Sequence, residues 1–210
     1  IEERTLAEVL EACEKAGVPV VLAGGAGAGT LAEMSACAAI GSPHATSAED
    51  TAVILYTSGT TGHPKGAELS HANLFLNCAV VVPKLVPFTR TDLRALACLP
   101  LFHSFGQTCV QNATIAAGGS FTLLPRFDAG QAFELIERDR ISLFAGVPTM
   151  YFALLHHQGA REYDVSSLRY CMTGGAPMPV EVMNAFEERY PVKILEGFGL
   201  SETSPVASFT

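Results

Sequence analysis

The chain has 210 residues, of which 49% are hydrophobic and 16% charged, a composition typical of a packed globular protein and not of a disordered one. Its net charge of -8 repels a phosphate backbone, which excludes nucleic acid as an expected partner. No apolar stretch approaches the roughly 20 residues that a membrane-spanning helix needs, and the first residues do not resemble a signal peptide. The six cysteines lack CxxC spacing, so we expect reduced core thiols and a cytoplasmic location.

Residues 1–50 are predicted to form the end of an α/β subdomain followed by a linker. The expected elements are a helix at 6–13, a strand at 18–22, a glycine-rich turn at 24–29, a helix at 31–40 and a turn-rich connector at 42–47. We place the boundary to the next region at this connector.

From residue 51 onward, short apolar strands alternate with amphipathic helices. The strands are predicted at 52–56, 95–99, 121–124, 143–145, 168–173 and 192–195, and the helices at 70–82, 107–117, 129–138, 149–157 and 180–189. Because parallel neighbouring strands need helical crossovers, this alternation predicts an α/β fold with a mostly parallel sheet. The chain has no initiator methionine and ends abruptly at Thr210, so we expect it to be part of a longer protein.

The segment YTSGTTGHPKG at 56–66 is predicted to follow a strand and to precede the helix that Ser70 opens. Its glycines let backbone N–H groups approach an anion, its hydroxyls can donate to phosphate oxygens, and Lys65 supplies a compact positive charge. It is not a Walker A loop, because Lys65 lies between Pro64 and Gly66. The predicted phosphate ligands are Thr57, Ser58, Gly59, Thr60, Thr61, Gly62 and Lys65.

Three further segments carry the remaining signal, namely LPLFHSFG at 99–106, TGGAP at 173–177 and EGFGLSET at 196–203. With the segment at 56–66, they resemble in order the four motifs of the AMP-forming acyl-adenylate synthetase superfamily. Its members include acyl-CoA ligases, nonribosomal peptide adenylation domains and firefly-type luciferases, and the sequence is most similar to bacterial long-chain fatty acyl-CoA ligases. The resemblance implies that residues 51–210 are an AMP/ATP-binding part of the large N-terminal domain, without the C-terminal domain.

The resemblance also implies roles for individual residues. Lys65, His103 and Glu202 would be catalytic, Ser201 would touch the α-phosphate and Glu202 would bind Mg²⁺. The adenine would be bound by Gly174, Gly175, Ala176, Pro177, Glu196, Gly197, Phe198 and Gly199, and the acyl group by His103, Phe105, Gly146, Val147 and Thr149. Phe198 and Ser201 replace the family's commoner Tyr and Thr, yet they keep an aromatic face and a hydroxyl.

The implied reaction uses small-molecule substrates, ATP, a fatty acid and CoA, with Mg²⁺ as the cofactor. The complete protein would form acyl-AMP and then the CoA thioester, whereas this segment alone is expected to be inactive. One alternative is an adenylate-forming ligase for an aryl or amino acid, which the pocket around Phe105, 146–149 and Gly174 would distinguish. The other alternative is a non-catalytic remnant that binds nucleotide.

Overall fold

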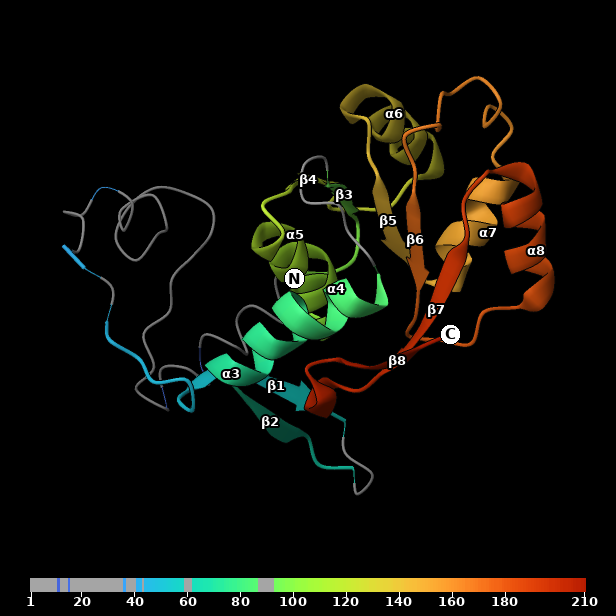
Figure 1. The fold of residues 1–210 in the computed structure, drawn as a ribbon. Coiled ribbons are helices and arrows are strands. Elements are labelled where there is room, and N and C mark those ends of the chain that lie inside the picture. Colours follow the sequence, from blue (N-terminus) through green and yellow to red (C-terminus); the bar gives the residue numbers. More distant parts are fainter. Residues whose placement is uncertain are drawn as a thin grey trace. The chain divides into compact units, whose positions relative to one another are not determined.

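The computed structural model describes residues 44–58, 62–86 and 93–210, together with residues 11, 15, 36, 41 and 42. The chain divides into two compact units, Ile1–Ala45 and Thr46–Thr210. The helices, strand and turn expected between residues 6 and 40 lie almost wholly outside the described residues, so they stay predictions. The second unit holds the strands that the structure describes (Figure 1).

A two-stranded antiparallel sheet opens the second unit. It consists of β1 (Thr51–Thr57) and β2 (Lys65–Ser70), and their last shared pair joins Thr57 to Lys65. The prediction of a strand-to-helix connection at 56–66 was therefore wrong, because this segment joins the two strands of a hairpin. The sequence of β2, KGAELS, contains Gly, Lys and Glu, which are depleted in strands, so pairing with β1 overrides its local preference.

One continuous helical segment follows β2. It comprises α3 (His71–Leu76), the π-helix η1 (Asn77–Val81) and α4 (Val82–Leu85). The Ser70 hydroxyl accepts the N–H of Asn73 at 3.2 Å, and the Asn73 side chain accepts the N–H of Ser70 at 3.0 Å. These reciprocal bonds form a capping box, and the helix predicted at 70–82 is confirmed with a later end.

A six-stranded sheet forms the centre of the unit. Its strands are β3 (Arg94–Ala97), β4 (Ser120–Leu123), β5 (Leu143–Gly146), β6 (Tyr170–Thr173), β7 (Ile194–Gly199) and β8 (Val206–Phe209). They lie in the order β4-β3-β5-β6-β7-β8; each neighbouring pair is parallel except β7 and β8. The predicted α/β fold with a mostly parallel sheet is confirmed, although β8 and the continuation of β7 to Gly199 were not predicted.

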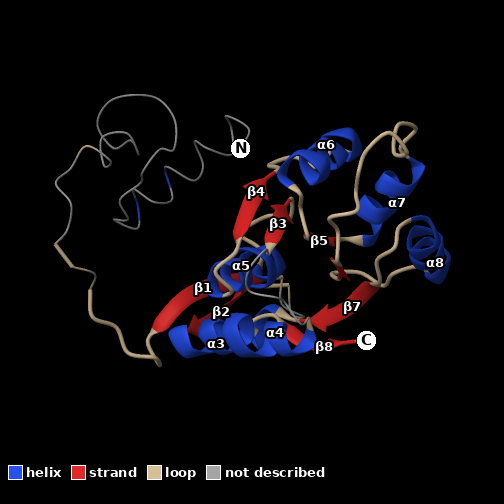
Figure 2. Ribbon diagram, turned by 45° about the horizontal axis from the view of Figure 1, so that its top comes forward, coloured by secondary structure: helices blue, strands red, loops and turns tan. Residues whose placement is uncertain are grey.

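Helices cover both faces of this sheet (Figures 1 and 2). The helices α6 (Ala129–Asp139), α7 (Pro148–His156) and α8 (Val180–Arg189) pack on one face, and η1, α4, the π-helix η2 (Phe105–Asn112) and α5 (Ala113–Ala116) pack on the other. Side chains alternate along β3 between the cores on the two faces of the sheet. Leu96 packs on the side of α6, α7 and α8, and Ala95 and Ala97 pack on the side of η1 and η2.

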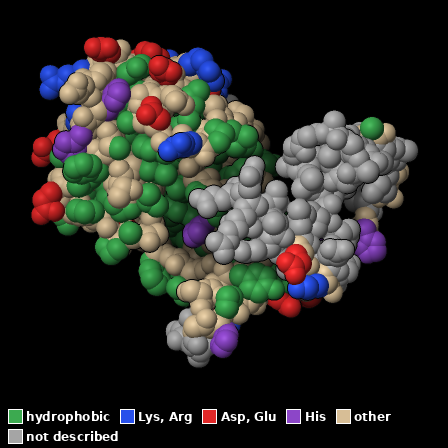
Figure 3. All heavy atoms as spheres, turned by 180° about the vertical axis from the view of Figure 1, so that it is seen from behind, with side chains coloured by type: hydrophobic (Ala, Val, Ile, Leu, Met, Phe, Trp, Pro, Cys, Tyr) green, Lys and Arg blue, Asp and Glu red, His purple; other side chains and the backbone are tan. Residues whose placement is uncertain are grey.

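Hydrophobic side chains also reach the surface, and Figure 3 shows several of them between charged groups on one face. Isolated exposed hydrophobic residues are normal for a globular protein. Within the described part of the chain, no helix combines the length and the apolar character that crossing a membrane requires.

Candidate active site

A cavity of about 240 Å³ lies beside the carboxyl ends of β6 and β7, the position at which open α/β sheets usually bind ligands. It gathers residues from the three segments 99–106, 173–177 and 196–203, which are up to about a hundred positions apart in the sequence. The predicted site residues in its wall are His103, Phe105, Gly174, Gly175, Gly197, Phe198, Gly199 and Ser201.

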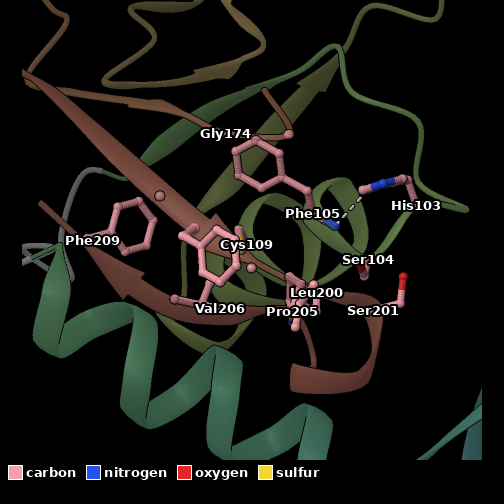
Figure 4. A pocket seen from close by; sticks show the side chains of 14 residues that line it. His103, Ser104, Phe105, Cys109, Gly174, Leu200, Ser201, Pro205, Val206 and Phe209 are labelled. Carbon is pink, nitrogen blue, oxygen red and sulfur yellow. Dashed lines mark hydrogen bonds between the residues drawn. The ribbon is translucent and has the colours of Figure 1, made fainter. Parts of the chain in front are cut away.

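His103 lies in the turn before η2, exposed to solvent at the rim of this cavity. Its ring nitrogen Nδ1 accepts the backbone N–H of Phe105 at 3.2 Å, as the dashed line in Figure 4 marks. A neutral imidazole whose Nδ1 accepts carries its proton on Nε2. The turn therefore sets the tautomer, and Nε2–H is the ring donor that His103 can offer to a ligand oxygen.

Glycines let two aromatic rings come close to backbone inside the cavity (Figure 4). A Cβ added at Gly174 would lie 3.3 Å from Cε1 of Phe105 and 3.1 Å from the carbonyl oxygen of Gly197. A Cβ added at Gly197 would lie only 2.8 Å from Cε1 of Phe209. Space of this shape, bounded by flat rings and bare backbone, suits a planar group such as a nucleobase.

The turn after β7 carries Ser201 and Glu202 in the short 3₁₀ helix η3 (Ser201–Thr203). Ser201 lines the cavity, and Glu202 is exposed. Within the described part of the chain, the Glu202 carboxylate has no hydrogen-bond or ion-pair partner, and no group of three His, Cys, Asp or Glu residues could hold a metal. Mg²⁺ is often held by one or two carboxylates together with phosphate oxygens, so this single carboxylate fits an ion delivered with a nucleotide.

The predicted phosphate loop connects β1 to β2. Thr57 and Lys65 pair at the turn end of the hairpin, where the Thr57 hydroxyl donates to the Lys65 carbonyl oxygen at 3.5 Å. Lys65 and Ser58 are exposed, and Gly62 has a φ of 81° that favours glycine. The predicted ligands Gly59, Thr60 and Thr61 lie outside the described residues. Because β2 contacts η3, the hairpin lies next to the turn that carries Glu202.

Three of the predicted adenine-binding residues do not line the cavity. Ala176 and Pro177 are exposed in the segment that follows β6, next to the cavity residues Gly174 and Gly175. The side chain of Glu196 is occupied in another way, since its carboxylate accepts the backbone N–H of Met178 at 2.8 Å. This bond ties β7 to the segment after β6, which holds the wall of the cavity in place.

The predicted acyl-binding turn lies between β5 and α7, outside the cavity wall itself. Val147 adjoins that wall, because its Cγ1 is 3.7 Å from the position of a Cβ on Gly175. Gly146 is buried against its neighbours, and a Cβ there would lie 2.9 Å from Cζ of Phe144. Thr149 is exposed on the first turn of α7.

Several cavity residues were missed by sequence reasoning, and most of them are apolar. They are Ser104, Cys109, Leu200, Pro205, Val206 and Phe209. Burial raises the pKa of the Cys109 thiol to about 12, so this side chain stays protonated and forms a wall rather than a nucleophile. Ser104 and Leu200 lie inside two of the recognised motifs and Pro205 lies two positions after one, whereas only the pairing of β8 with β7 brings Val206 and Phe209 to the cavity.

Comparison with known proteins gives a consistent result. The chain is 41% identical over 157 residues to a long-chain-fatty-acid–CoA ligase of Bacillus subtilis, covering 75% of this chain and 28% of that protein. It is 39% identical over 157 residues to a feruloyl-CoA synthase of an Amycolatopsis species, covering 75% and 31%. Among solved structures, apo MatB from Rhodopseudomonas palustris superposes with a TM-score of 0.85 at 30% identity, over 97% of this chain and 40% of that chain.

The chain thus spans less than a third of the length of these two curated relatives. The profile of the family described as AMP-binding enzyme matches residues 2–210, which is nearly the whole chain. With this match, the shared fold and relatives that are CoA ligases, the chain belongs to the AMP-binding enzyme family.

Proposed function

We propose that the intact protein carrying this chain activates a carboxylic acid with ATP and transfers the acyl group to CoA. The observation that carries this proposal is the cavity at the carboxyl ends of β6 and β7. It collects His103, Gly174 and Ser201 from three separate segments, and the carboxylate of Glu202, which has no partner among the described residues, lies in the same turn as Ser201. These groups are of the kinds that a nucleotide, a reacting carboxylate and a cation would each need as partners.

A fatty acid is the proposed substrate. The Bacillus relative at 41% identity is named for long-chain fatty acids, and the cavity has apolar walls that include Phe105, Val206 and Phe209. An aromatic acid is the second candidate, because the Amycolatopsis relative at 39% identity is named for feruloyl-CoA. The two candidates differ in the shape of the acyl group and share the chemistry of activation.

In the first step, a carboxylate oxygen attacks the α-phosphorus of ATP, the bond to the bridging β-phosphate oxygen breaks, and pyrophosphate leaves. His103 would donate Nε2–H to the substrate carboxylate and orient it, and the Ser201 hydroxyl would donate to an α-phosphate oxygen. Lys65 would offset the charge that develops on the departing pyrophosphate. Glu202 would hold Mg²⁺, which when bound neutralises negative charge on the phosphate oxygens.

In the second step, the thiol sulfur of CoA attacks the acyl carbonyl carbon. The bond between that carbon and the phosphate oxygen of AMP breaks, AMP leaves, and the thiol proton passes to solvent. The rings of Phe105 and Phe209, which Gly174 and Gly197 let pack close to backbone, would give the adenine a flat wall during both steps.

ATP–pyrophosphate exchange that depends on added acid tests the proposal in the intact protein. Lys65→Ala and Glu202→Ala should each lower the exchange rate at least tenfold, equivalent to about 1.4 kcal/mol of barrier or more. Lys84→Ala and Glu181→Ala are matched controls, because they remove the same charges from exposed positions on α4 and α8. The controls should exchange at the parental rate.

The acids added to the assay decide between the candidates. Higher kcat/KM for long-chain fatty acids than for ferulate or 4-coumarate would support the fatty-acid proposal, and the reverse order would replace it with the aromatic one. ATP binding without exchange for any acid would instead identify a protein that binds nucleotide without catalysis. Parental exchange in both the Lys65 and the Glu202 variants would refute the assigned roles.

A further inference from the structure

The turn that carries Ser201 and Glu202 is closed by its own hydrogen bonds. The backbone N–H of Leu200 donates to the carbonyl oxygen of Pro205 at 3.0 Å. The Thr203 hydroxyl donates to the carbonyl oxygen of Leu200 at 3.0 Å and also contacts that of Pro205. These bonds define the shape of the turn, but none of them fixes it against the rest of the protein.

Among the described residues, the side-chain hydrogen bonds that reach this turn from another element come from Asn77. Asn77, the first residue of the π-helix η1, is 5% exposed. Its side-chain N–H groups donate to the carbonyl oxygens of Thr203 at 3.3 Å and Val206 at 3.2 Å. Its Oδ1 accepts the N–H of Val206 at 3.4 Å. The two carbonyls and one N–H around the amide define which of its atoms is nitrogen and which is oxygen.

A buried asparagine requires such partners, because a polar group removed from water without hydrogen bonds is destabilising. The same helix otherwise buries apolar side chains beside it, including Cys78 and Val82, and an apolar residue could fill the position of Asn77. The amide is therefore best explained by what it holds, namely the backbone on both sides of the cis peptide bond between Ser204 and Pro205.

Asn77 also lies on the helical segment that follows β2 without interruption. That segment continues from β2, whose first residue is Lys65, and β2 itself contacts η3. The side chain of Asn77 thus joins the helical segment that follows the strand of Lys65 to the turn that carries Glu202. These are the two charged groups proposed above to act on the phosphates, Lys65 directly and Glu202 through Mg²⁺.

We propose that Asn77 is a positioning residue, which holds the turn at 201–206 so that Ser201 and Glu202 stay aligned with the β1–β2 hairpin. This inference rests on the proposed function, because it acts through Glu202. It assigns no contact between Asn77 and the substrates.

Hydrogen exchange of the intact protein without ligand tests the structural part. In Asn77→Leu, amides in the peptide 200–209 should exchange at least tenfold faster, since the acceptor for the N–H of Val206 is lost. The control is Val82→Ala, which removes buried packing from the same helical segment and keeps the three bonds of Asn77. The control should lower Tm and leave exchange at 200–209 unchanged relative to the rest of the sheet. Asn77→Ser gives the same comparison should the leucine variant fail to fold.

The functional part is tested by ATP–pyrophosphate exchange in the presence of the carboxylic acid substrate, measured as a function of Mg²⁺ concentration. Asn77→Leu should raise the Mg²⁺ concentration for half-maximal rate about fivefold and lower the maximal rate at least tenfold. Asn77→Asp should behave similarly, because its carboxylate would face the carbonyl oxygens of Thr203 and Val206. In a Glu202→Gln background, Asn77→Leu should lower the maximal rate by less than a further twofold, as expected for two residues that act through one group.

The outcomes separate the inference from the function on which it rests. If Glu202→Gln leaves the rate and the Mg²⁺ dependence unchanged, both the role of Glu202 and the inference are overturned. If Glu202→Gln impairs the reaction but Asn77→Leu changes neither hydrogen exchange nor Mg²⁺ dependence, the inference alone is overturned. The inference also fails if Val82→Ala reproduces the effects of Asn77→Leu.

Discussion

Replacing Gly199 with alanine should displace the turn after β7. A Cβ at this position would lie 2.3 Å from the carbonyl oxygen of Pro205 and 3.0 Å from its carbonyl carbon. Carbon–oxygen contacts in proteins are usually no shorter than about 3.3 Å, so the two backbones must separate by about 1 Å. Both clashing atoms belong to backbone, and no side-chain rotation can relieve the contact.

The expected magnitude follows from the bonds that meet at Pro205. Separation breaks the bond from the N–H of Leu200 at 3.0 Å and the contact with the Thr203 hydroxyl. At about 1 kcal/mol net for each bond, the free energy of unfolding should fall by about 2 kcal/mol. A displacement of about 1 Å in a group that positions substrate can cost about 100-fold in rate, and Ser201 lies two positions from the substitution.

Urea unfolding and ATP–pyrophosphate exchange in the intact protein measure these two effects. Gly159→Ala is the matched control, because a Cβ there would meet nothing closer than 3.4 Å, at Nε2 of His157. This control should keep the parental exchange rate. Exchange by Gly199→Ala within twofold of the parent would refute the argument that the position of this turn limits catalysis.

Two further predictions concern stability. Tyr151 is fully buried and donates its hydroxyl to the carbonyl oxygen of Met172 at 2.7 Å, so Tyr151→Phe should lower the free energy of unfolding by about 1–2 kcal/mol. An unchanged urea midpoint would contradict this. Hydrogen bonds from Arg138 and then Thr122 lower the pKa of Asp139 to about 2, so its ionised form stabilises the fold above the unfolded pKa of about 3.9, and this contribution is lost as the pH falls through 2. The free energy of unfolding should therefore fall more steeply between pH 4 and 2 in the parent than in Asp139→Asn. Equal losses in the two proteins, measured by urea unfolding at each pH, would contradict this prediction.

Much of the fold was accessible from local sequence patterns. Buried parallel strands are short apolar runs, and their amphipathic crossover helices show a different period, so segments such as 143–145 and 129–138 could be assigned without an alignment. The glycine-rich segments at 173–177 and 196–203 stand out in the sequence, and in the structure a side chain at Gly174 or Gly197 would collide with backbone or an aromatic ring. Their functional roles remain predictions.

The elements that were missed depend on contacts between distant residues. The strand β2 contains poor strand formers and exists because it pairs with β1, and β8 exists because it pairs with β7. The helix periodicity of 70–82 does not reveal that η1 is a π-helix, and a lone asparagine at position 77 has no distinctive pattern around it. Its importance depends on residues more than a hundred positions later, which meet it only in the folded chain.

The division of strands between two sheets affects how the site can be altered. In a nucleotide-binding fold whose phosphate loop extends from a central strand, a change in that loop strains the core directly. Here β1 and β2 share no strand with the six-stranded sheet, so backbone hydrogen bonding does not transmit strain from one sheet to the other. We therefore expect a change in the connection between β1 and β2 to leave the register of the parallel strands around the cavity unaffected.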